Sequence, residues 1–135
     1  MLYSSRTLPY ISCNKINSLP VGVKMSKFDD AMGKFNNVSV VKQANVYFDG
    51  KVVSRTVLFP DGSKKTLGIM LPGEYLFNTD SKEEMEIMSG ELEVRIGDAT
   101  DWQPVKSGQT FEVPARSQFT VKVKMLTDYC CSFVK

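Results

Sequence analysis

The chain is 135 residues long, carries a formal net charge of +2 and contains no histidine. This length fits one domain that buries most of its apolar surface in a single core, and 42% apolar with 24% charged residues is ordinary for a globular protein. Because 17 basic residues nearly balance 15 acidic ones, charge alone does not favour nucleic acid as a partner. No apolar run approaches the ~20 residues of a membrane-spanning helix.

Residues 1–24 contain basic residues but no acidic one. Three interpretations stay open: a mis-assigned start, because "MSKF" from Met25 looks like a true start; a disordered tail; or an organelle-targeting segment. In each case we expect residues 1–24 to form an extension outside the folded core. Residues 25–40 are expected to form an N-terminal segment that contains a loop or a short helix.

From Val38 onward, short runs rich in valine, phenylalanine, tyrosine and threonine alternate with turn signals. The turn signals are Asp49-Gly50, Pro60-Asp61-Gly62, Pro72-Gly73, Asp80-Ser81, Ser107-Gly108 and Pro114. Residues 84–96, which include Ser89-Gly90, fit either a hairpin or one bent strand. Roughly eight to ten strands at this spacing, with no helical periodicity after residue 40, predict a single all-β domain over residues 41–135.

The chain has three cysteines, Cys13, Cys130 and Cys131. An odd count with two adjacent members does not describe a disulfide framework, and the CxxC spacing of many metal sites is absent. Reduced thiols are typical of the cytoplasm, so we expect a cytoplasmic protein. Because Cys130 and Cys131 must point to opposite faces of the last strand and have no basic neighbour, we expect both to be structural.

The spacing between Gly73 and Gly90 resembles the first motif of the cupins, which are small jelly-roll β-barrels. In that motif a glycine precedes two histidines, a glutamate and a second glycine. Here Thr79 and Ser81 stand at the histidine positions and Glu83 stands at the glutamate position. We therefore expect a cupin-like jelly-roll barrel, although turns built on glycine and proline also arise by chance in other β proteins.

The second cupin motif fits Gly108 and Pro114, with Phe119 at its histidine position. A divalent metal in such a barrel needs imidazole nitrogens or several convergent carboxylates. Threonine, serine and phenylalanine supply neither, and Glu83 alone holds a metal only weakly. The sequence therefore predicts a barrel with no metal and no other cofactor.

A longer set of segments in fixed order carries a more specific resemblance. The segments, across residues 47–133, are "YFDGKV", "GIMLPGEYLFNT", "EEMEIMSGELEV", "DATDWQ", "SGQTFEVP", "SQFTV" and "YCCSF". They resemble the pyrimidine/purine nucleoside phosphorylase family of small metal-free bacterial cupins. The resemblance implies a cytoplasmic homodimeric pentosyltransferase of nucleoside catabolism and salvage. Its reaction would convert a purine or pyrimidine nucleoside and phosphate into the free base and ribose 1-phosphate.

Glu83 is the candidate catalytic residue. On a strand it shares one face with Met85 and Ile87, while Glu84 and Glu86 lie on the other face, which we expect to be solvated. One carboxylate in an apolar pocket could bind ribose hydroxyls or stabilise a cationic sugar. Phosphorolysis needs no covalent intermediate, because positioning and electrostatics can supply most of the rate.

The predicted substrate-binding residues are polar or aromatic: Thr79, Ser81, Arg116, Ser117, Phe119, Tyr47 and Tyr129. The guanidinium of Arg116 could grip phosphate at two points, or be a solvated loop residue; Lys51, Lys64 and Lys65 are weaker candidates. Thr79 and Ser117 could donate hydroxyls to substrate or cap strand ends. The aromatic residues could stack on any base or simply pack in the core.

Three functions remain open from the residues alone: a phosphorylase, a non-catalytic module that binds a small sugar-like or nucleotide ligand, and a dimerisation scaffold. A cation close to the pocket would favour the phosphorylase over the binding module. A pocket filled by Met85, Ile87 and Phe119 would favour the scaffold. Fold alone decides none of them.

Overall fold

The computed structural model describes residues 33–135, and Val38–Lys135 form one compact unit. The predicted extension, residues 1–24, and residues 25–32 of the N-terminal segment lie outside the described residues. In the part of the chain that is described, no helix is long and apolar enough to span a membrane. The architecture is all-β, as the sequence predicts.

The described residues form strands and one short 3-10 turn, and the strands divide into two antiparallel sheets. The elements are β1 (Ser39–Val40), β2 (Asn45–Tyr47), η3 (Phe48–Gly50), β3 (Val52–Leu58), β4 (Lys64–Met70), β5 (Gly73–Asn78), β6 (Lys82–Ser89), β7 (Glu91–Ile96), β8 (Gln103–Lys106), β9 (Thr110–Val113), β10 (Gln118–Val123) and β11 (Thr127–Val134). The eleven strands slightly exceed the expected number because β1 and β2 are only two and three residues long.

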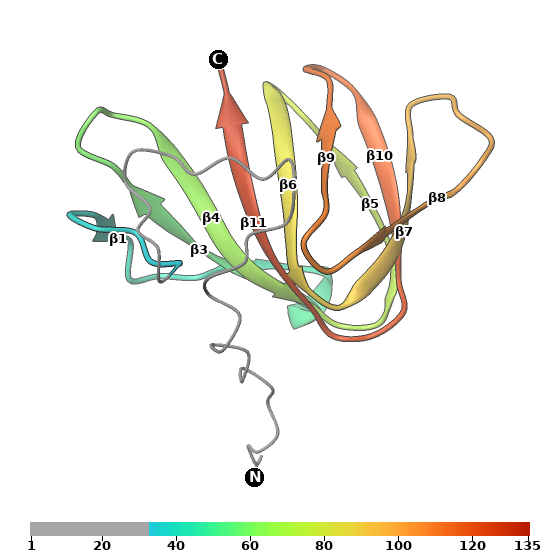
Figure 1. Cartoon of the computed structure of the whole chain (residues 1–135), viewed down its shortest axis with the longest axis horizontal. Coiled ribbons are helices and arrows are strands. Elements are labelled where there is room, and N and C mark those ends of the chain that lie inside the picture. Colours follow the sequence, from blue (N-terminus) through green and yellow to red (C-terminus); the bar gives the residue numbers. More distant parts are fainter. Residues whose placement is uncertain (1–32) are drawn as a thin grey trace, which may run out of the picture. The chain divides into compact units, whose positions relative to one another are not determined.

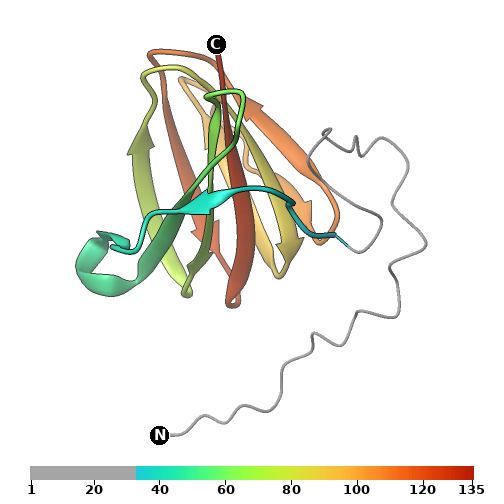
Figure 2. The same ribbon diagram turned by 90° about the vertical axis from the view of Figure 1, so that its left-hand side faces the viewer.

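The sheets form two layers (Figures 1 and 2). The larger has the order β1-β3-β4-β11-β6-β9, with β2 also paired to β3, and the smaller has the order β5-β10-β7-β8. Along β10, Phe119, Val121 and Val123 are buried while the residues between them are more exposed. This alternation directs one face of each sheet into a shared core, which contains residues of both layers.

Turn residues fix the hairpins of the larger sheet. Phe48 and Asp49 have φ of 52° and 56°, and Gly50 has φ of 90°, so the chain reverses in the left-handed region between β2 and β3. Between β3 and β4, the Asp61 carboxylate accepts hydrogen bonds from the amide and the hydroxyl of Ser63, at 2.9 and 2.6 Å. Both turns stand where the sequence predicts them.

Gly90 is where the chain changes sheets. β6 belongs to the larger sheet and β7 to the smaller, so residues 84–96 form the bent strand and not the hairpin of the two sequence interpretations. Gly90 has φ of +105°, and a Cβ there would lie 2.5 Å from Thr127 Oγ1 and 2.7 Å from the carbonyl oxygen of Leu126. Only glycine satisfies both the conformation and the close approach.

Candidate functional site

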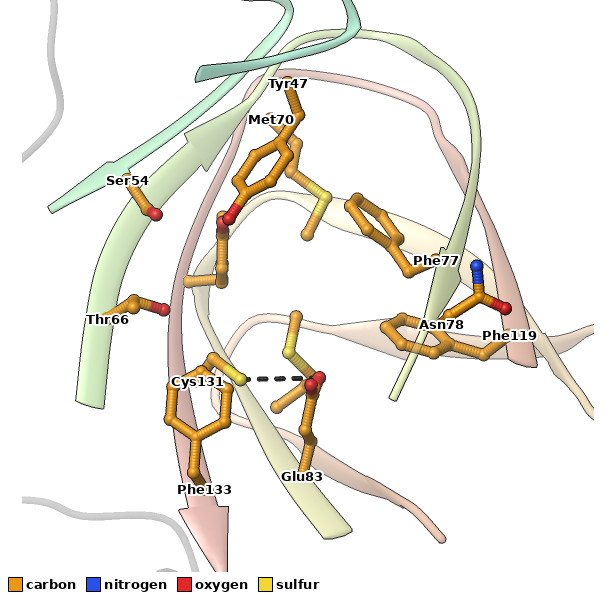
Figure 3. A pocket seen from close by; sticks show the side chains of 12 residues that line it. Tyr47, Ser54, Thr66, Met70, Phe77, Asn78, Glu83, Phe119, Cys131 and Phe133 are labelled. Atoms are coloured by element: carbon orange, nitrogen blue, oxygen red, sulfur yellow. Dashed lines mark hydrogen bonds between the residues drawn. The ribbon is translucent and has the colours of Figure 1, made fainter. Parts of the chain in front are cut away.

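A cavity of about 160 Å³ lies between the two sheets. Its lining is mostly aromatic and aliphatic, with a few hydroxyl, amide and thiol groups and one carboxylate (Figure 3). The lining residues are Tyr47, Ser54, Thr66, Met70, Phe77, Asn78, Glu83, Met85, Phe119, Tyr129, Cys131 and Phe133. The barrel therefore keeps an open interior, and Met85 and Phe119 border this space without filling it.

The larger sheet supplies most of the wall through alternate residues of its inner face. On β11, Tyr129, Cys131 and Phe133 lie at intervals of two, which is the spacing that turns side chains to the same side of a sheet. Glu83 and Met85 follow the same rule on β6. The shared face that the sequence predicts for these two residues is thus observed, and Ile87 continues it as a fully buried residue.

Glu83 is the one carboxylate among the described residues that line the cavity. The thiol of Cys131 donates a hydrogen bond to Glu83 Oε1 at 3.5 Å, drawn as a dashed line in Figure 3. Burial raises the pKa of Glu83 above its ordinary value of 4.5, the Cys131 hydrogen bond lowers it, and the charge of Asp80 raises it further. The group is therefore a desolvated carboxyl that favours a cationic neighbour.

Cys131 and Tyr129 are two further titratable groups of this cavity. Burial is the first cause that raises the pKa of each above its usual range, and the charge of Glu83 raises both further. Both groups thus keep their protons at neutral pH. A thiol in this state is a poor nucleophile, which agrees with the structural role that the sequence predicts for it.

The Tyr129 ring is held by groups on β3 and β4. Its hydroxyl hydrogen-bonds Ser54, and Ser54 Oγ in turn accepts a hydrogen bond from Asn45 Nδ2 at 3.2 Å. Gly68 stands opposite Tyr129 on β4, and a Cβ at this position would lie 2.8 Å from the tyrosine hydroxyl. The absent side chain of Gly68 therefore leaves the space that the ring occupies.

The smaller sheet supplies a flat aromatic wall. Phe119 of β10 stands directly opposite Phe77 of β5, and the two rings are stacked with centroids 5.3 Å apart and planes inclined by 25°. Phe111 packs edge-on against Phe119 at 6.0 Å. Phe77 and Phe119 both line the cavity and give it an aromatic wall on the side of the smaller sheet.

The predicted site residues divide into two groups. Glu83, Phe119, Tyr47 and Tyr129 line the cavity, while Thr79, Ser81, Arg116 and Ser117 are absent from its lining. Tyr47 is 47% exposed, whereas Phe119 and Tyr129 are buried. Ser81 is half-buried just before β6, and Arg116 is exposed with φ of +52°.

Thr79 instead joins the end of β5 to the loop that leads into β10. Its hydroxyl donates to the carbonyl oxygen of Pro114 at 2.7 Å and accepts from the amide of Ser117 at 3.0 Å. The Thr79 amide also donates to the Ser117 carbonyl at 2.9 Å. These bonds correspond to the capping alternative that the sequence left open for Thr79.

Sequence reasoning did not single out most of the other lining residues. Phe133 and Cys131 lie on the same face of the strand as Tyr129. The expectation that Tyr129 points into the cavity therefore also predicts that these two residues line it. Thr66 and Ser54 carry no local signal, because they reach the cavity through the pairing of β3 with β4. Lys64, two residues before Thr66 on the same strand, holds its Nζ 5.4 Å from the Phe133 ring centroid.

The Trp102 ring makes cation–π contacts with two side chains. The guanidinium carbon of Arg95 lies 4.6 Å and the Nζ of Lys122 lies 4.3 Å from the ring centroid. Trp102 does not line the cavity.

The donor atoms of the cavity do not fit a divalent metal. The chain has no histidine, and within residues 33–135 no three cysteine, aspartate or glutamate side chains gather in a group that could hold a metal ion. Glu83 Oε1 is the acceptor of the Cys131 thiol, which is protonated and does not ligate.

Two sheets around an aromatic cavity define a small cupin-type barrel. An RmlC-like cupin from Shewanella frigidimarina NCIMB 400 has the same fold, with a TM-score of 0.55 at 16% identity over 68% of this chain and 84% of that chain. A crystal structure of a protein of unknown function from Acinetobacter sp. ADP1 is more similar, with a TM-score of 0.73 at 44% identity, and covers 75% of this chain and 98% of that one.

The chain belongs to the pyrimidine/purine nucleoside phosphorylase family, whose model matches residues 42–133. A relative in Geotalea daltonii named pyrimidine/purine nucleoside phosphorylase is 63% identical over 103 residues, which are 76% of this chain and 99% of the relative. A relative of the same name in Geobacter sulfurreducens is 60% identical over 103 residues, with the same coverage. The family expected from the sequence is confirmed.

Proposed function

We propose that this chain is a metal-independent pentosyltransferase that cleaves purine and pyrimidine nucleosides with inorganic phosphate, giving the free base and ribose 1-phosphate. Family membership over residues 42–133 carries the proposal. The names of the relatives at about 60% identity point to the same substrate class. The cavity supports it chemically, because a flat aromatic wall lies across from one desolvated carboxyl.

The base stacks against the aromatic wall formed by Phe119 and Phe77, whose own rings are stacked on each other with planes inclined by 25°. Stacking is tolerant of base identity because every base has a π-face, so one wall serves both purines and pyrimidines. The polar groups at the cavity, among them Asn78 and Thr66, are available to ribose hydroxyls. Broad specificity then follows from stacking, which does not read the base edges.

Glu83 stabilises the transition state. As the bond from C1′ to the base lengthens, positive charge grows on the ribose ring, and a nearby carboxylate lowers the energy of that state more than the energy of the neutral substrate. Burial of Glu83 strengthens this effect, because less water screens the charge. Cys131 keeps the carboxylate oriented by the hydrogen bond to Oε1.

Phosphate-dependent base release tests the proposal. Purified protein, treated with a chelator, is incubated with uridine or adenosine in phosphate, in sulfate of equal ionic strength, and in neither. We expect uracil and adenine only in phosphate, at a rate that chelation does not change. Release without phosphate would indicate hydrolysis, and a loss of activity on chelation would overturn metal independence.

A non-catalytic module that binds a nucleotide or sugar-like ligand is the competing function. One observation favours it, since no lysine or arginine of residues 33–135 is among those that line the cavity. The same assay separates the two: the module binds uridine in equilibrium dialysis but releases no base in any buffer.

We further propose that the enzyme is a cytoplasmic homodimer, as its family resemblance implies. Light scattering coupled to size-exclusion chromatography gives the mass directly: about twice the 15.1 kDa of the chain supports the dimer, and the mass of one chain contradicts it.

A further inference from the structure

Phosphate brings negative charge to a cavity whose lining, within the described part of the chain, offers a carboxyl and no cation. A site for phosphate therefore needs a lysine or arginine close to the opening. Several cations are already paired or face elsewhere. Lys82 pairs with Glu112 at 3.3 Å, and Arg116 is exposed and absent from the lining.

Lys64 faces the cavity side of the larger sheet. Thr66 and Met70 of the same strand line the cavity, and residues spaced by two share a face, so Lys64 points the same way at the start of β4. The position of its Nζ, 5.4 Å from the ring centroid of the lining residue Phe133, is an independent sign of the same direction. Its neighbour Lys65 faces the opposite side and lies against the Phe59 ring.

Strand register sets Lys64 and Glu83 in one row across the sheet. Ser132 pairs with Lys65, so continuing that antiparallel register by one residue brings Phe133 opposite Lys64. On its other side Phe133 pairs with Glu83, and Figure 3 shows these two side chains next to each other at one end of the cavity. With strands about 4.8 Å apart, the backbones of Lys64 and Glu83 are separated by about 10 Å.

Phosphorolysis requires this separation of charge. An oxygen of hydrogen phosphate forms a bond to C1′, the bond from C1′ to the base nitrogen breaks, and its electron pair leaves with the base, which takes up the proton that phosphate gives up. An ammonium group holds the attacking dianion while a carboxylate faces the cationic sugar. Phe133 lies between Lys64 and Glu83 in this row, and no ion pair joins these two described residues.

We propose that Lys64 is the phosphate-binding residue of this cavity, moving from the Phe133 ring to the phosphate at the end where Glu83 lies. This inference rests on the proposed function and names the binding site of its second substrate, phosphate. The flexible four-carbon stem of lysine allows the movement, and Lys64 forms no ion pair with any other residue in the described range 33–135.

Three variants test the proposal: Lys64→Gln, Lys64→Arg and, as the matched control, Lys65→Gln on the opposite face. Loss of one charge-assisted contact is expected to raise the phosphate KM about ten- to a hundredfold in Lys64→Gln. Lys64→Arg restores the charge and should stay within about fivefold of wild type, and Lys65→Gln within about twofold. The Kd for uridine measured without phosphate should not change in any variant.

Equal phosphate KM values in Lys64→Gln and Lys65→Gln would overturn the assignment. If the wild-type protein releases no base, the proposed function fails, and titration calorimetry with inorganic phosphate alone decides the inference. Phosphate binding that is lost in Lys64→Gln and kept in Lys65→Gln supports it. Binding that is absent in wild type, or equal in both variants, refutes it. Matching circular dichroism spectra exclude misfolding as the cause.

Discussion

Replacing Glu83 by glutamine removes the charge of the cavity while keeping the shape of the side chain. Glutamine retains a carbonyl oxygen that accepts from the Cys131 thiol, which donates to Oε1 at 3.5 Å in the wild type. The substitution therefore tests the charge of Glu83 with little change in the shape of the side chain. Glu84→Gln is the matched control, because Glu84 is the next residue on β6 and its side chain faces away from the cavity.

The expected loss follows from Coulomb's law. A carboxylate in contact with the cationic ribose, at about 4–5 Å and an effective dielectric constant of about 20, contributes about 3–4 kcal/mol. Each ~1.4 kcal/mol changes a rate tenfold, so kcat should fall about 10²–10³-fold in Glu83→Gln. In Glu84→Gln it should change less than about twofold.

The pH dependence has a definite sign. Because burial raises the pKa of Glu83 above 4.5, wild-type kcat should rise with pH through this higher pKa as the carboxylate forms, and the residual kcat of Glu83→Gln should lack that acid limb. A raised folded-state pKa also means that the stability Glu83 contributes is present at low pH and is lost as pH rises through that pKa. The glutamine variant should thus unfold at no lower temperature than wild type at pH 7.

Steady-state assays of base release from pH 4 to 9, with thermal unfolding followed by circular dichroism, measure both effects. A kcat of Glu83→Gln equal to that of wild type, or a decrease in the kcat of Glu84→Gln as large as that of Glu83→Gln, would refute the electrostatic role. An unfolding temperature well below that of wild type would attribute the loss to folding.

Three further predictions concern the scaffold and the aromatic wall. Gly90→Ala should lower the unfolding free energy by about 2–5 kcal/mol, through backbone strain and through steric overlap of the new Cβ with neighbouring atoms. Gly62→Ala should lower it by only about 1–3 kcal/mol, because Gly62 has a positive φ but nothing within 4 Å of an added Cβ. Equal urea midpoints for the two variants would contradict the steric overlap at Gly90. Thr79→Val should cost about 1–3 kcal/mol with an unchanged nucleoside KM, whereas a higher KM at unchanged stability would restore Thr79 to the substrate site. Phe119→Leu should raise the KM for uridine and the KM for adenosine alike by about tenfold. A KM increase no larger than that of Phe111→Leu would contradict stacking of the base on Phe119.

Most of the fold is encoded locally. Alternation of apolar and polar residues sets the strands, and Asp49-Gly50 and Pro60-Gly62 stand at turns that the structure contains. Local pattern did not decide between a hairpin and a bend at Gly90, because both need a glycine there. The choice depends on Thr127 and Leu126, which approach from the other end of the chain.

The site could be predicted only in part. Glu83 and Phe119 occupy positions of a known motif, and both line the cavity. Thr79 occupies such a position too, but its hydrogen-bond partners are 35 and 38 residues away in the chain and direct its hydroxyl to the backbone. From the sequence alone, Cys131 is expected to be structural only. Its contact with Glu83 could not be predicted, because it arises from the pairing of β11 with β6.

β11 joins two parts of the larger sheet, because β4 and β6 each pair with β11 and not with each other. Before β11 docks, both strands present an unpaired edge, so partly folded chains are open to aggregation and folding waits on contacts between distant residues. The same strand brings Tyr129, Cys131 and Phe133 to the cavity. If the chain acts as proposed, a nucleoside finds its complete binding surface only in the finished barrel, and its binding energy stabilises that state rather than any intermediate that precedes it.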